Sequence, residues 1–315
     1  MKKSSILVTG GAGFIGSHLV DAFIGAGHDV VVLDNVSTGF TANLNPKATF
    51  VQGDITDAEL VGELFARHKF DVVDHHAAQL DVRKSVADPI FDARTNILGT
   101  LTLLEAARKS GKLKRFIFAS TGGAVYGEQE YFPADEAHPT APISPYGITK
   151  RAIELYLNYY HLVHQIPYVA FRYTNVYGPR QSAQGEAGVV AIFIERLLNG
   201  QQCTIHGSGE QTRDYVFVGD LVSAHLLALD GRIEGSRIYN ISTAIETDVN
   251  EIFKLLSSLV TNENAKATHG PAKLGEQLRS VCSYDLIERE LGWRPTVSLK
   301  EGLSQTVKAF SAQRK

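Results

Sequence analysis

The chain has 315 residues, of which 44% are hydrophobic and 21% are charged, a composition typical of a folded globular protein and not of a disordered or fibrous one. Its 31 Lys and Arg residues and 34 Asp and Glu residues give a formal net charge of −3 and are dispersed, which argues against nucleic-acid binding. Two cysteines, no metal-ligand spacing and no apolar run near the roughly 20 residues of a membrane helix predict a cytoplasmic protein without metal or membrane attachment.

Short apolar runs alternate with longer amphipathic stretches through the first half of the chain. Strands are predicted at 6–8, 30–33, 49–51, 72–73, 116–118 and 167–172, and helices at 14–26, 57–67, 92–109 and 146–164. Strands that are apolar throughout are typical of a sheet that helices cover on both faces. The order therefore predicts an α/β fold with right-handed crossovers and a doubly wound parallel sheet of the Rossmann type.

After about residue 176 the segments become shorter and more mixed, with helices predicted near 283–291 and 300–311. We therefore expect two domains. The first is a cofactor-binding Rossmann domain at 1–176, which a later segment at about 213–240 rejoins. The second is a smaller, mixed α/β lobe at 177–315 that binds the substrate.

A glycine-rich turn follows the first strand and opens the first helix. Gly10, Gly13 and Gly16 have G-x-x-G-x-x-G spacing, which permits a tight turn, close approach of a diphosphate and close packing of helix on strand. The N–H groups of the helix N-terminus would face the phosphates. Asp34 ends the second strand, where a carboxylate can accept hydrogen bonds from both ribose hydroxyls and would repel a 2′-phosphate. The sequence therefore predicts NAD in preference to NADP.

Further cofactor contacts are expected where the third and fourth strands end. The pair Asp54 and Ile55 could reach the adenine edge, and the pair Ala77 and Ala78 leaves room for the backbone of the cofactor. The adjacent pair His75 and His76 has no third ligand at metal spacing. We therefore expect these histidines to pack or to form hydrogen bonds.

Tyr146 and Lys150 lie four residues apart where a long helix begins, so they share one helical face. A phenol titrates near pH ~10 in water, but an ammonium and the positive nicotinamide ring would stabilise the phenolate as a general base. The pair alone also fits an ordinary amphipathic helix. Ser120 and Thr121, at the end of the fifth strand, offer hydroxyls beside the nicotinamide or are simply strand-end residues.

These motifs resemble those of extended short-chain dehydrogenases/reductases, and specifically of nucleotide-sugar epimerases of the UDP-glucose 4-epimerase type, over nearly the whole chain. The resemblance rests on Gly10–His18, Leu33–Asn35, Gly53–Ile55, His76–Gln79, Asn96, Ser120–Gly127, Tyr146–Lys150, Phe171–Arg180 and Gly207–Asp220. It implies an NAD-dependent isomerase of galactose metabolism that inverts C4 of a UDP-hexose through a transient 4-keto intermediate. The UDP-sugar would be its only reaction partner, because NAD is regenerated in each turnover.

The resemblance also implies roles for single residues. The residues that would bind NAD are Gly10, Gly13, Phe14, Ile15, Gly16, Asp34, Asn35, Asp54, Ile55, Asn96, Lys150 and Tyr173. Asn175 and Arg213 would hold the diphosphate of the substrate, with Tyr215 nearby. Thr121 would supply the catalytic hydroxyl beside Tyr146, because its offset of 25 residues matches the usual spacing, and Ser120 is the alternative.

The choice of sugar is also addressed by the resemblance. In such epimerases one position limits the space around the C2 substituent, and counting back from Glu290–Arg294 brings it to Ser280. A serine there would admit N-acetylated sugars, and the adjacent Arg279 could reach the diphosphate. Ser280 could equally be an ordinary strand residue.

Other functions share many of these motifs. Dehydratase relatives carry an acid after the strand-end threonine, and decarboxylase relatives a glutamate before Val-Tyr-Gly, whereas this chain has Gly122, Gly123 and Ala124. A UDP-glucuronate 4-epimerase remains an alternative, and a non-catalytic NAD-binding regulator is disfavoured because Tyr146 and Lys150 are both present. By resemblance, the helices at 92–109 and 146–164 would pair in a homodimer, although the apolar residues of the second helix could instead pack internally.

Overall fold

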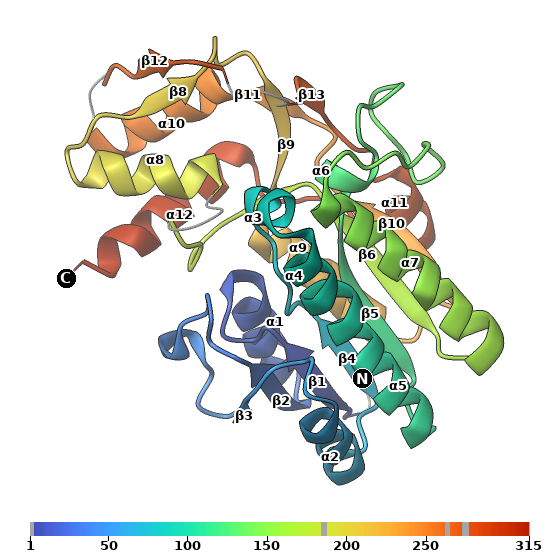
Figure 1. The fold of residues 1–315 in the computed structure, drawn as a ribbon. Helices are drawn as coiled ribbons and strands as arrows, with labels where there is room; N and C mark the ends of the chain where they lie inside the picture. The colour runs from blue at the N-terminus through green and yellow to red at the C-terminus, as the bar shows by residue number, and fades with distance from the viewer. Residues whose placement is uncertain (1–2, 184–187, 262–264, 273–276, 315) are drawn as a thin grey trace. The chain divides into compact units, whose positions relative to one another are not determined.

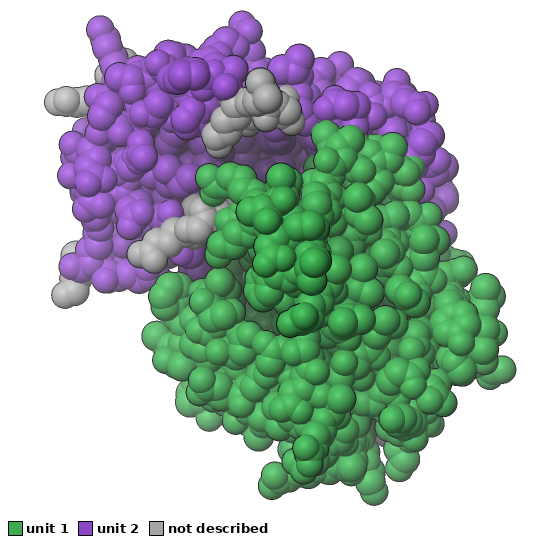
Figure 2. Space-filling view, in the orientation of Figure 1, with its two compact units in different colours: residues 1–127, 140–172, 222–239 green, residues 128–139, 173–221, 240–315 purple. Residues whose placement is uncertain are grey.

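The structure, a computed structural model, describes residues 3–183, 188–261, 265–272 and 277–314. The chain forms two compact units (Figure 2). Unit 1 contains residues 1–127, 140–172 and 222–239, and unit 2 contains residues 128–139, 173–221 and 240–315. Each unit is therefore assembled from three stretches of the chain and not from one continuous half.

A seven-stranded sheet forms the centre of unit 1, with strand order β10-β6-β5-β4-β1-β2-β3 (Figure 1). The strands are β1 (Ser5–Thr9), β2 (Asp29–Asp34), β3 (Thr49–Gln52), β4 (Val72–His75), β5 (Arg115–Thr121), β6 (Tyr168–Tyr173) and β10 (Arg237–Ile241). β1 pairs in parallel with both β2 and β4, so the strand order reverses beside β1. In open α/β sheets, ligands bind at this reversal, beyond the carboxyl ends of the strands. The predicted Rossmann-type parallel sheet is confirmed.

Helices cover both faces of this sheet. The helical segments of unit 1 are α1 (Phe14–Gly25), η1 (Thr41–Asn43), α2 (Ala58–His68), α3 (Val82–Ala87), α4 (Pro89–Ala93), η2 (Arg94–Leu98), α5 (Gly99–Ser110), α6 (Gly122–Val125) and α7 (Pro145–His164); α9 (Val218–Leu229) begins in unit 2 and ends in unit 1. In Figure 1, α2, α5 and α7 lie on one face of the sheet, and α1 and α9 lie on the other.

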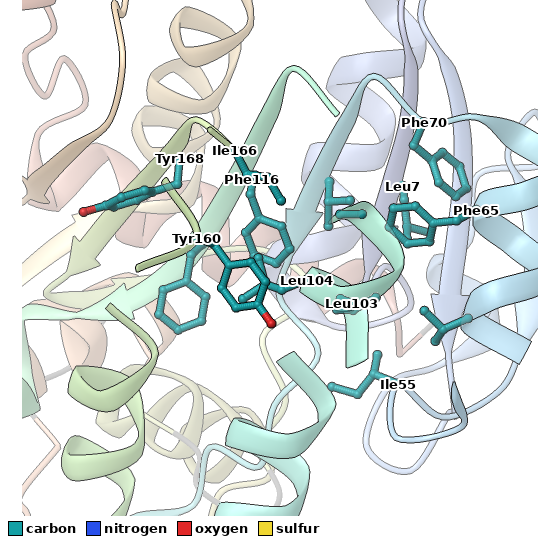
Figure 3. Packing of buried hydrophobic residues seen from close by; sticks show 14 of the residues in the cluster. Leu7, Ile55, Phe65, Phe70, Leu103, Leu104, Phe116, Tyr160, Ile166 and Tyr168 are labelled. Atoms are coloured by element: carbon teal, nitrogen blue, oxygen red, sulfur yellow. The ribbon is translucent and has the colours of Figure 1, made fainter. Parts of the chain in front are cut away.

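A continuous apolar core joins the sheet to α2, α5 and α7 (Figure 3). Leu7 of β1 and Phe116 of β5 are fully buried in it, together with Leu103 and Leu104 of α5. Tyr160 of α7 closes the core at one side and donates a 2.6 Å hydrogen bond from its hydroxyl to a carboxylate oxygen of Glu105. Burying such side chains is the main stabilising term of a fold, and here it holds α7 against β5.

The helix expected at 92–109 is present as a continuous helical run over residues 89–110, and it contains a π-helical turn. α4 ends at Ala93, the segment 94–98 forms a π-helical turn, and α5 begins at Gly99. The side chain of Asn96 lies inside this turn and is buried. Single π-turns often mark functional positions, and periodicity alone does not reveal them.

Unit 2 contains a small sheet built around β9 (Thr212–Phe217). Its other elements are β7 (Asn175–Tyr177), α8 (Val189–Leu198), β8 (Thr204–His206), β11 (Glu246–Asp248), α10 (Val249–Thr261), β12 (Thr268–Gly270), β13 (Arg279–Ser280), α11 (Asp285–Leu291) and α12 (Leu299–Ala312). β9 pairs with β11 in antiparallel fashion and with β13 and β7 in parallel fashion. The mixed α/β lobe expected in the second half of the chain therefore surrounds this sheet.

The units differ in extent from the expected domains in three segments. Residues 173–176, expected in the first domain, belong to unit 2. Residues 128–139, expected in the first domain, belong to unit 2, because Ala134 forms a bridge to Cys282 and its carbonyl accepts a 3.1 Å bond from the Asn240 side chain. Residues 213–221, expected to rejoin the first domain, stay in unit 2 because β9 pairs only with strands of that unit in the described part of the chain. Residues 222–239 do return to unit 1. None of the described helices is both long and apolar enough to cross a membrane.

Candidate active site

The glycine-rich turn joins β1 to α1 and lies against the end of β4. Gly10 has φ +71°, and a Cβ placed on it would lie 2.7 Å from the amide nitrogen of Ala77. A Cβ on Gly16 would lie 2.2 Å from the carbonyl oxygen of Gly10, so the helix starts in close contact with the turn. Gly13 is the N-cap of α1, and no side chain among the described residues caps it. The uncapped N–H groups at the start of α1 are suited to binding a diphosphate.

Asp34 ends β2, and its buried carboxylate points into the same turn. One carboxylate oxygen accepts a 2.9 Å hydrogen bond from the Ala12 amide, and the other accepts a 2.7 Å bond from the Val36 amide. These bonds fix the carboxylate beside the glycine-rich turn, where a ribose would follow the diphosphate. The turn, the uncapped helix start and this carboxylate together fit the dinucleotide that the sequence predicts.

Asn35 and Asp54 are joined across the ends of β2 and β3. The amide of Asn35 donates a 2.8 Å hydrogen bond to one oxygen of Asp54, whose other oxygen accepts bonds from the amide and hydroxyl of Thr56. Burial alone would raise the pKa of Asp54, but these bonds hold it below the ordinary range. Asp54, which was expected to reach the adenine edge, and Asn35, which was expected to bind NAD, are therefore hydrogen-bonded to each other.

Two residues expected to contact NAD have side chains that already contact other parts of the protein. The Ile55 side chain is buried in the core (Figure 3), so only its backbone is left for a ligand. Asn96 is 1% exposed, and its side chain bonds both backbone groups of Gln79 and also the Asp92 carboxylate. Asn96 therefore holds the loop after β4, a function that its place in the chain did not indicate.

The remaining residues expected to contact NAD have intermediate or low exposure. Phe14, Ile15, Ala77 and Ala78 are half-buried at the two loops beside the reversal of strand order. Tyr173, the last residue of β6, is 6% exposed and belongs to unit 2.

Lys150 and Tyr146 meet at the first turns of α7. The Lys150 side chain is buried, and its Nζ donates a 2.8 Å hydrogen bond to the carbonyl oxygen of Ala119. The same Nζ lies 5.8 Å from the centroid of the half-buried Tyr146 ring. Burial lowers the pKa of Lys150 to about 8. A cation so close to a phenol favours its phenolate form, as general-base chemistry requires.

The structure separates the two candidate hydroxyls at the end of β5. Ser120 is 3% exposed, and its hydroxyl donates a 2.7 Å hydrogen bond to the carboxylate of Glu154. Thr121 is half-buried at the N-cap of α6, where its side chain makes no capping hydrogen bond within the described chain. The geometry therefore favours Thr121 as the hydroxyl that can meet a substrate.

Glu154 and Arg172 did not stand out in the sequence, although both touch this region. Glu154 follows Tyr146 and Lys150 at four-residue spacing on the same face of α7. That spacing was the available signal, because a glutamate on an otherwise buried helical face needs a partner. Its partner Arg172 lies in β6 and could be identified only from the folded chain.

The histidines after β4 take part in two hydrogen-bonded groups. His75 lies between the hydroxyls of Thr9 and Thr100, at 2.7 Å and 2.8 Å. His76 and His225 each hydrogen-bond one oxygen of Asp74, at 2.9 Å and 2.7 Å. Burial lowers the pKa of both His75 and His76. The expected hydrogen-bonding role is confirmed for both, and His225 and Asp74 are partners that the sequence did not reveal.

The candidate substrate residues of unit 2 lie on neighbouring strands around β9. The exposed Asn175 is opposite Tyr215 in the β7–β9 pair, and Arg213 is opposite Ser280 in the β9–β13 pair. Asp214 between them is buried and accepts hydrogen bonds from Thr243 and Ala244. Burial raises the pKa of Asp214 to about 6 despite these bonds. The sheet therefore brings together four residues that are scattered in the sequence.

Arg279 and Ser280 differ sharply in exposure although they are adjacent. Ser280 is 2% exposed. The exposed guanidinium of Arg279 lies 2.5 Å from a carboxylate oxygen of Glu246 and 3.9 Å from the centroid of the Phe132 ring. To bind a diphosphate, the Arg279 guanidinium would have to contact the phosphates while keeping its ion pair with Glu246, or break that ion pair.

Comparisons with known proteins agree with these features. A family model described as "NAD dependent epimerase/dehydratase family" matches residues 6–242. The chain is 44% identical over 309 residues to the UDP-glucose 4-epimerase of Mycolicibacterium smegmatis, with 96% of this chain and 97% of that protein covered.

Two solved structures are similar over almost their full length. The UDP-glucose 4-epimerase of Thermotoga maritima with UDP-glucose is 47% identical with a TM-score of 0.96, covering 99% of this chain and 100% of that one. The UDP-glucose 4-epimerase of Thermus thermophilus in complex with NAD is 42% identical with a TM-score of 0.91, covering 98% and 99%. The predicted family and its cofactor NAD are confirmed, and the chain belongs to the NAD-dependent epimerase/dehydratase family.

Proposed function

We propose that this protein inverts C4 of UDP-glucose and UDP-galactose. The observation that carries the proposal is the grouping at the start of α7, where the buried Lys150 ammonium lies beside the Tyr146 ring and bonds the end of β5. The residues that follow Thr121 are Gly122 and Gly123, so no acid stands where a dehydratase needs one. The relatives named UDP-glucose 4-epimerase support the same reaction.

The residues of unit 1 supply the proton chemistry. The Tyr146 phenolate takes the proton of the sugar 4-hydroxyl, directly or through Thr121, while Lys150 stabilises the phenolate charge. NAD, when bound, supplies a hydride acceptor that removes the C4 hydrogen and later returns it. The 4-keto sugar then rotates about its link to the diphosphate and presents its opposite face. Tyr146 finally donates the proton to the new 4-hydroxyl. The reaction therefore has no net oxidation and needs no external redox partner.

The residues of unit 2 are proposed to hold the substrate by its nucleotide diphosphate, through Asn175 and Arg213. Inversion requires the sugar to present both faces of C4, so the sugar must be held weakly and the diphosphate strongly. A guanidinium is well suited to the second task, because it donates paired hydrogen bonds to phosphate oxygens. The proposal extends to N-acetylated UDP-hexoses if Ser280 lies at the C2 substituent.

A panel of UDP-sugars tests this proposal. We expect the purified protein to convert UDP-galactose to UDP-glucose, with the C4 inversion followed by proton NMR, and the Tyr146→Phe variant to serve as the matched inactive control. Formation of a 4-keto-6-deoxy product would indicate a dehydratase, and inversion of UDP-glucuronate alone would move the activity to the uronate. Absence of any C4 inversion in the panel overturns the proposal.

We also propose that two copies of the chain pair through α7. Ile148, Leu155, Tyr159 and Leu162 recur at helical spacing on α7 and are 53%, 56%, 48% and 69% exposed. Leu157 and Tyr160, which could have packed internally, do so. An apolar stripe of this kind is typical of a helix that packs against a partner.

Sedimentation analysis checks the pairing. We expect a dimer for the natural chain and a monomer for the double variant Leu155→Asp, Leu162→Asp. The control is Ile245→Asp in unit 2, an equally exposed apolar residue at 64%. A natural chain that sediments as a monomer, or a double variant that remains dimeric, contradicts the proposed interface.

A further inference from the structure

The carboxylate of Glu154 is the centre of a buried hydrogen-bond group in unit 1. Glu154 is 1% exposed. One of its oxygens accepts bonds from the Ser120 hydroxyl at 2.7 Å and from Nε of Arg172 at 2.9 Å. The other accepts from Nη2 of Arg172 at 2.8 Å and from Nη1 of Arg151 at 3.1 Å. Four donors therefore fix this carboxylate in one orientation.

Two side chains of α7 hold two consecutive residues of β5. Lys150 bonds the backbone carbonyl of Ala119, and Glu154, one turn later, bonds the side chain of Ser120. Thr121 is the next residue and the last of the strand. Because Thr121 is one planar peptide unit away from Ser120 in the same strand, these two bonds restrain the position of Thr121 relative to α7. The helix that holds Ala119 and Ser120 is also the helix that carries Tyr146.

Arg172 extends the same group to the far side of the turn that follows Thr121. Its Nη1 donates a 3.0 Å bond to the hydroxyl of Tyr126, which follows the short helix α6. Burial alone would lower the pKa of Arg172, but its bonds to Glu154 and the charge of that carboxylate raise it. The segment 121–126 is therefore held at its start through Ser120 and at its end through Tyr126.

We propose that Glu154, with Arg172 as its charge partner, is a positioning residue that keeps Thr121 in register with Tyr146, and that Ser120 is the contact through which it acts. The proposal rests on the epimerase function proposed above. A buried ion pair by itself often adds little stability compared with apolar residues of the same volume, so its orientation beside the reacting residues is the informative feature. Shifts of about 1 Å in such groups can reduce a rate by roughly 100-fold.

The test compares Ser120→Ala, Glu154→Gln and the double variant as NAD-loaded proteins, with kcat and KM for UDP-galactose, NAD content and melting temperature measured for each. We expect kcat to fall about 10- to 100-fold in Ser120→Ala, with KM and NAD content nearly unchanged. The double variant should have a kcat no lower than that of the slower single variant, because the two substitutions disrupt the same hydrogen bond between Ser120 and Glu154. The matched control is Ser110→Ala, which deletes a hydroxyl bonded to the Ala107 carbonyl in α5 and should keep full activity.

Each outcome distinguishes between explanations. Normal kcat with a lower melting temperature in Ser120→Ala means that the group only stabilises the fold and overturns the proposal, and this variant suffices if Glu154→Gln does not fold. If kcat falls as far in Ser120→Ala as in Tyr146→Phe, and if this loss adds in full to that of Glu154→Gln in the double variant, then Ser120 is the reacting hydroxyl. That result also overturns the proposal. If the natural chain inverts no UDP-hexose, the proposed function fails first and the positioning role falls with it.

Discussion

Lys150 is 4% exposed, and its Nζ donates a 2.8 Å hydrogen bond to the carbonyl oxygen of Ala119. This contact joins the first turns of α7 to the end of β5, although the two residues lie 31 positions apart. Burial of this ammonium disfavours its charged form and outweighs the opposing effect of the Asp92 carboxylate, so its pKa falls to about 8.

The stability of the fold should depend on pH through Lys150. Its folded-state pKa of about 8 lies below the ordinary value of 10.5, so between these values the unfolded chain binds a proton that the folded chain does not. Below pH 8 both states carry the charge, and burying it lowers the free energy of unfolding by its full amount. Between pH 8 and 10.5 the free energy of unfolding rises with pH, by about 1.4 kcal/mol per pH unit. Relative to Lys150→Met, the natural chain should gain stability over this window in urea unfolding at pH 7 to 10. A difference that is constant with pH would exclude the effect.

The pH dependence of activity should also move when this cation is lost. In Lys150→Met the Tyr146 phenolate loses its stabilising charge, so its pKa should rise and the pH optimum of epimerisation should shift upward. NAD should also bind more weakly. The profile of kcat/KM against pH for UDP-galactose measures the shift, and an unshifted profile would remove Lys150 from the activation of Tyr146.

Tyr146→Phe should lower kcat by at least ~100-fold, the usual contribution of a general base. The phenylalanine ring keeps the packing of the half-buried tyrosine, so the protein should stay folded and NAD should stay bound. Single-turnover reduction of NAD by UDP-galactose, followed at the absorbance of NADH, isolates the chemical step. Near-normal turnover would show that another group accepts the proton.

Asp34 should determine the choice between NAD and NADP. Asp34→Asn removes the charge and leaves one acceptor oxygen where the carboxylate uses two, so it keeps the bond to only one of the amides of Ala12 and Val36, and NAD should bind more weakly. The double variant Asp34→Gly, Asn35→Arg should prefer NADP, because the repelling carboxylate is replaced by a cation. Asp29→Asn, on the exposed start of the same strand, is the control. A natural protein that carries NADP contradicts this role.

Ser280 should determine whether N-acetylated sugars are accepted. If the small side chain leaves room at C2, the natural chain inverts both UDP-galactose and UDP-N-acetylglucosamine. Ser280→Tyr should then abolish the second activity and spare the first, because an added ring excludes the larger substituent sterically. Activity on the plain hexose reports that the variant is folded, which matters because Ser280 is 2% exposed. A natural chain inert on the N-acetyl sugar rules the assignment out.

The α/β class, the cofactor turn and the Tyr-Lys pair could be predicted from the sequence because each is a local pattern. Gly10 to Gly16 directly follow an apolar strand, Asp34 ends the next strand, and Tyr146 and Lys150 share a helical face at four-residue spacing. Such patterns depend on the period of a helix or strand and on backbone sterics, which neighbouring residues determine by themselves.

The tertiary structure alone decided which of these residues are available for chemistry. The sequence favoured Thr121 over Ser120 only through its spacing from Tyr146, whereas in the structure the two differ physically because Glu154, 34 positions from Ser120, accepts a hydrogen bond from the Ser120 hydroxyl. Asn96 is turned inward by the loop after β4, and residues 128–139 join unit 2 through contacts with Cys282 and Asn240. The physical reason is that a buried polar group must find a partner, and strand order, not sequence spacing, determines which partner lies within reach.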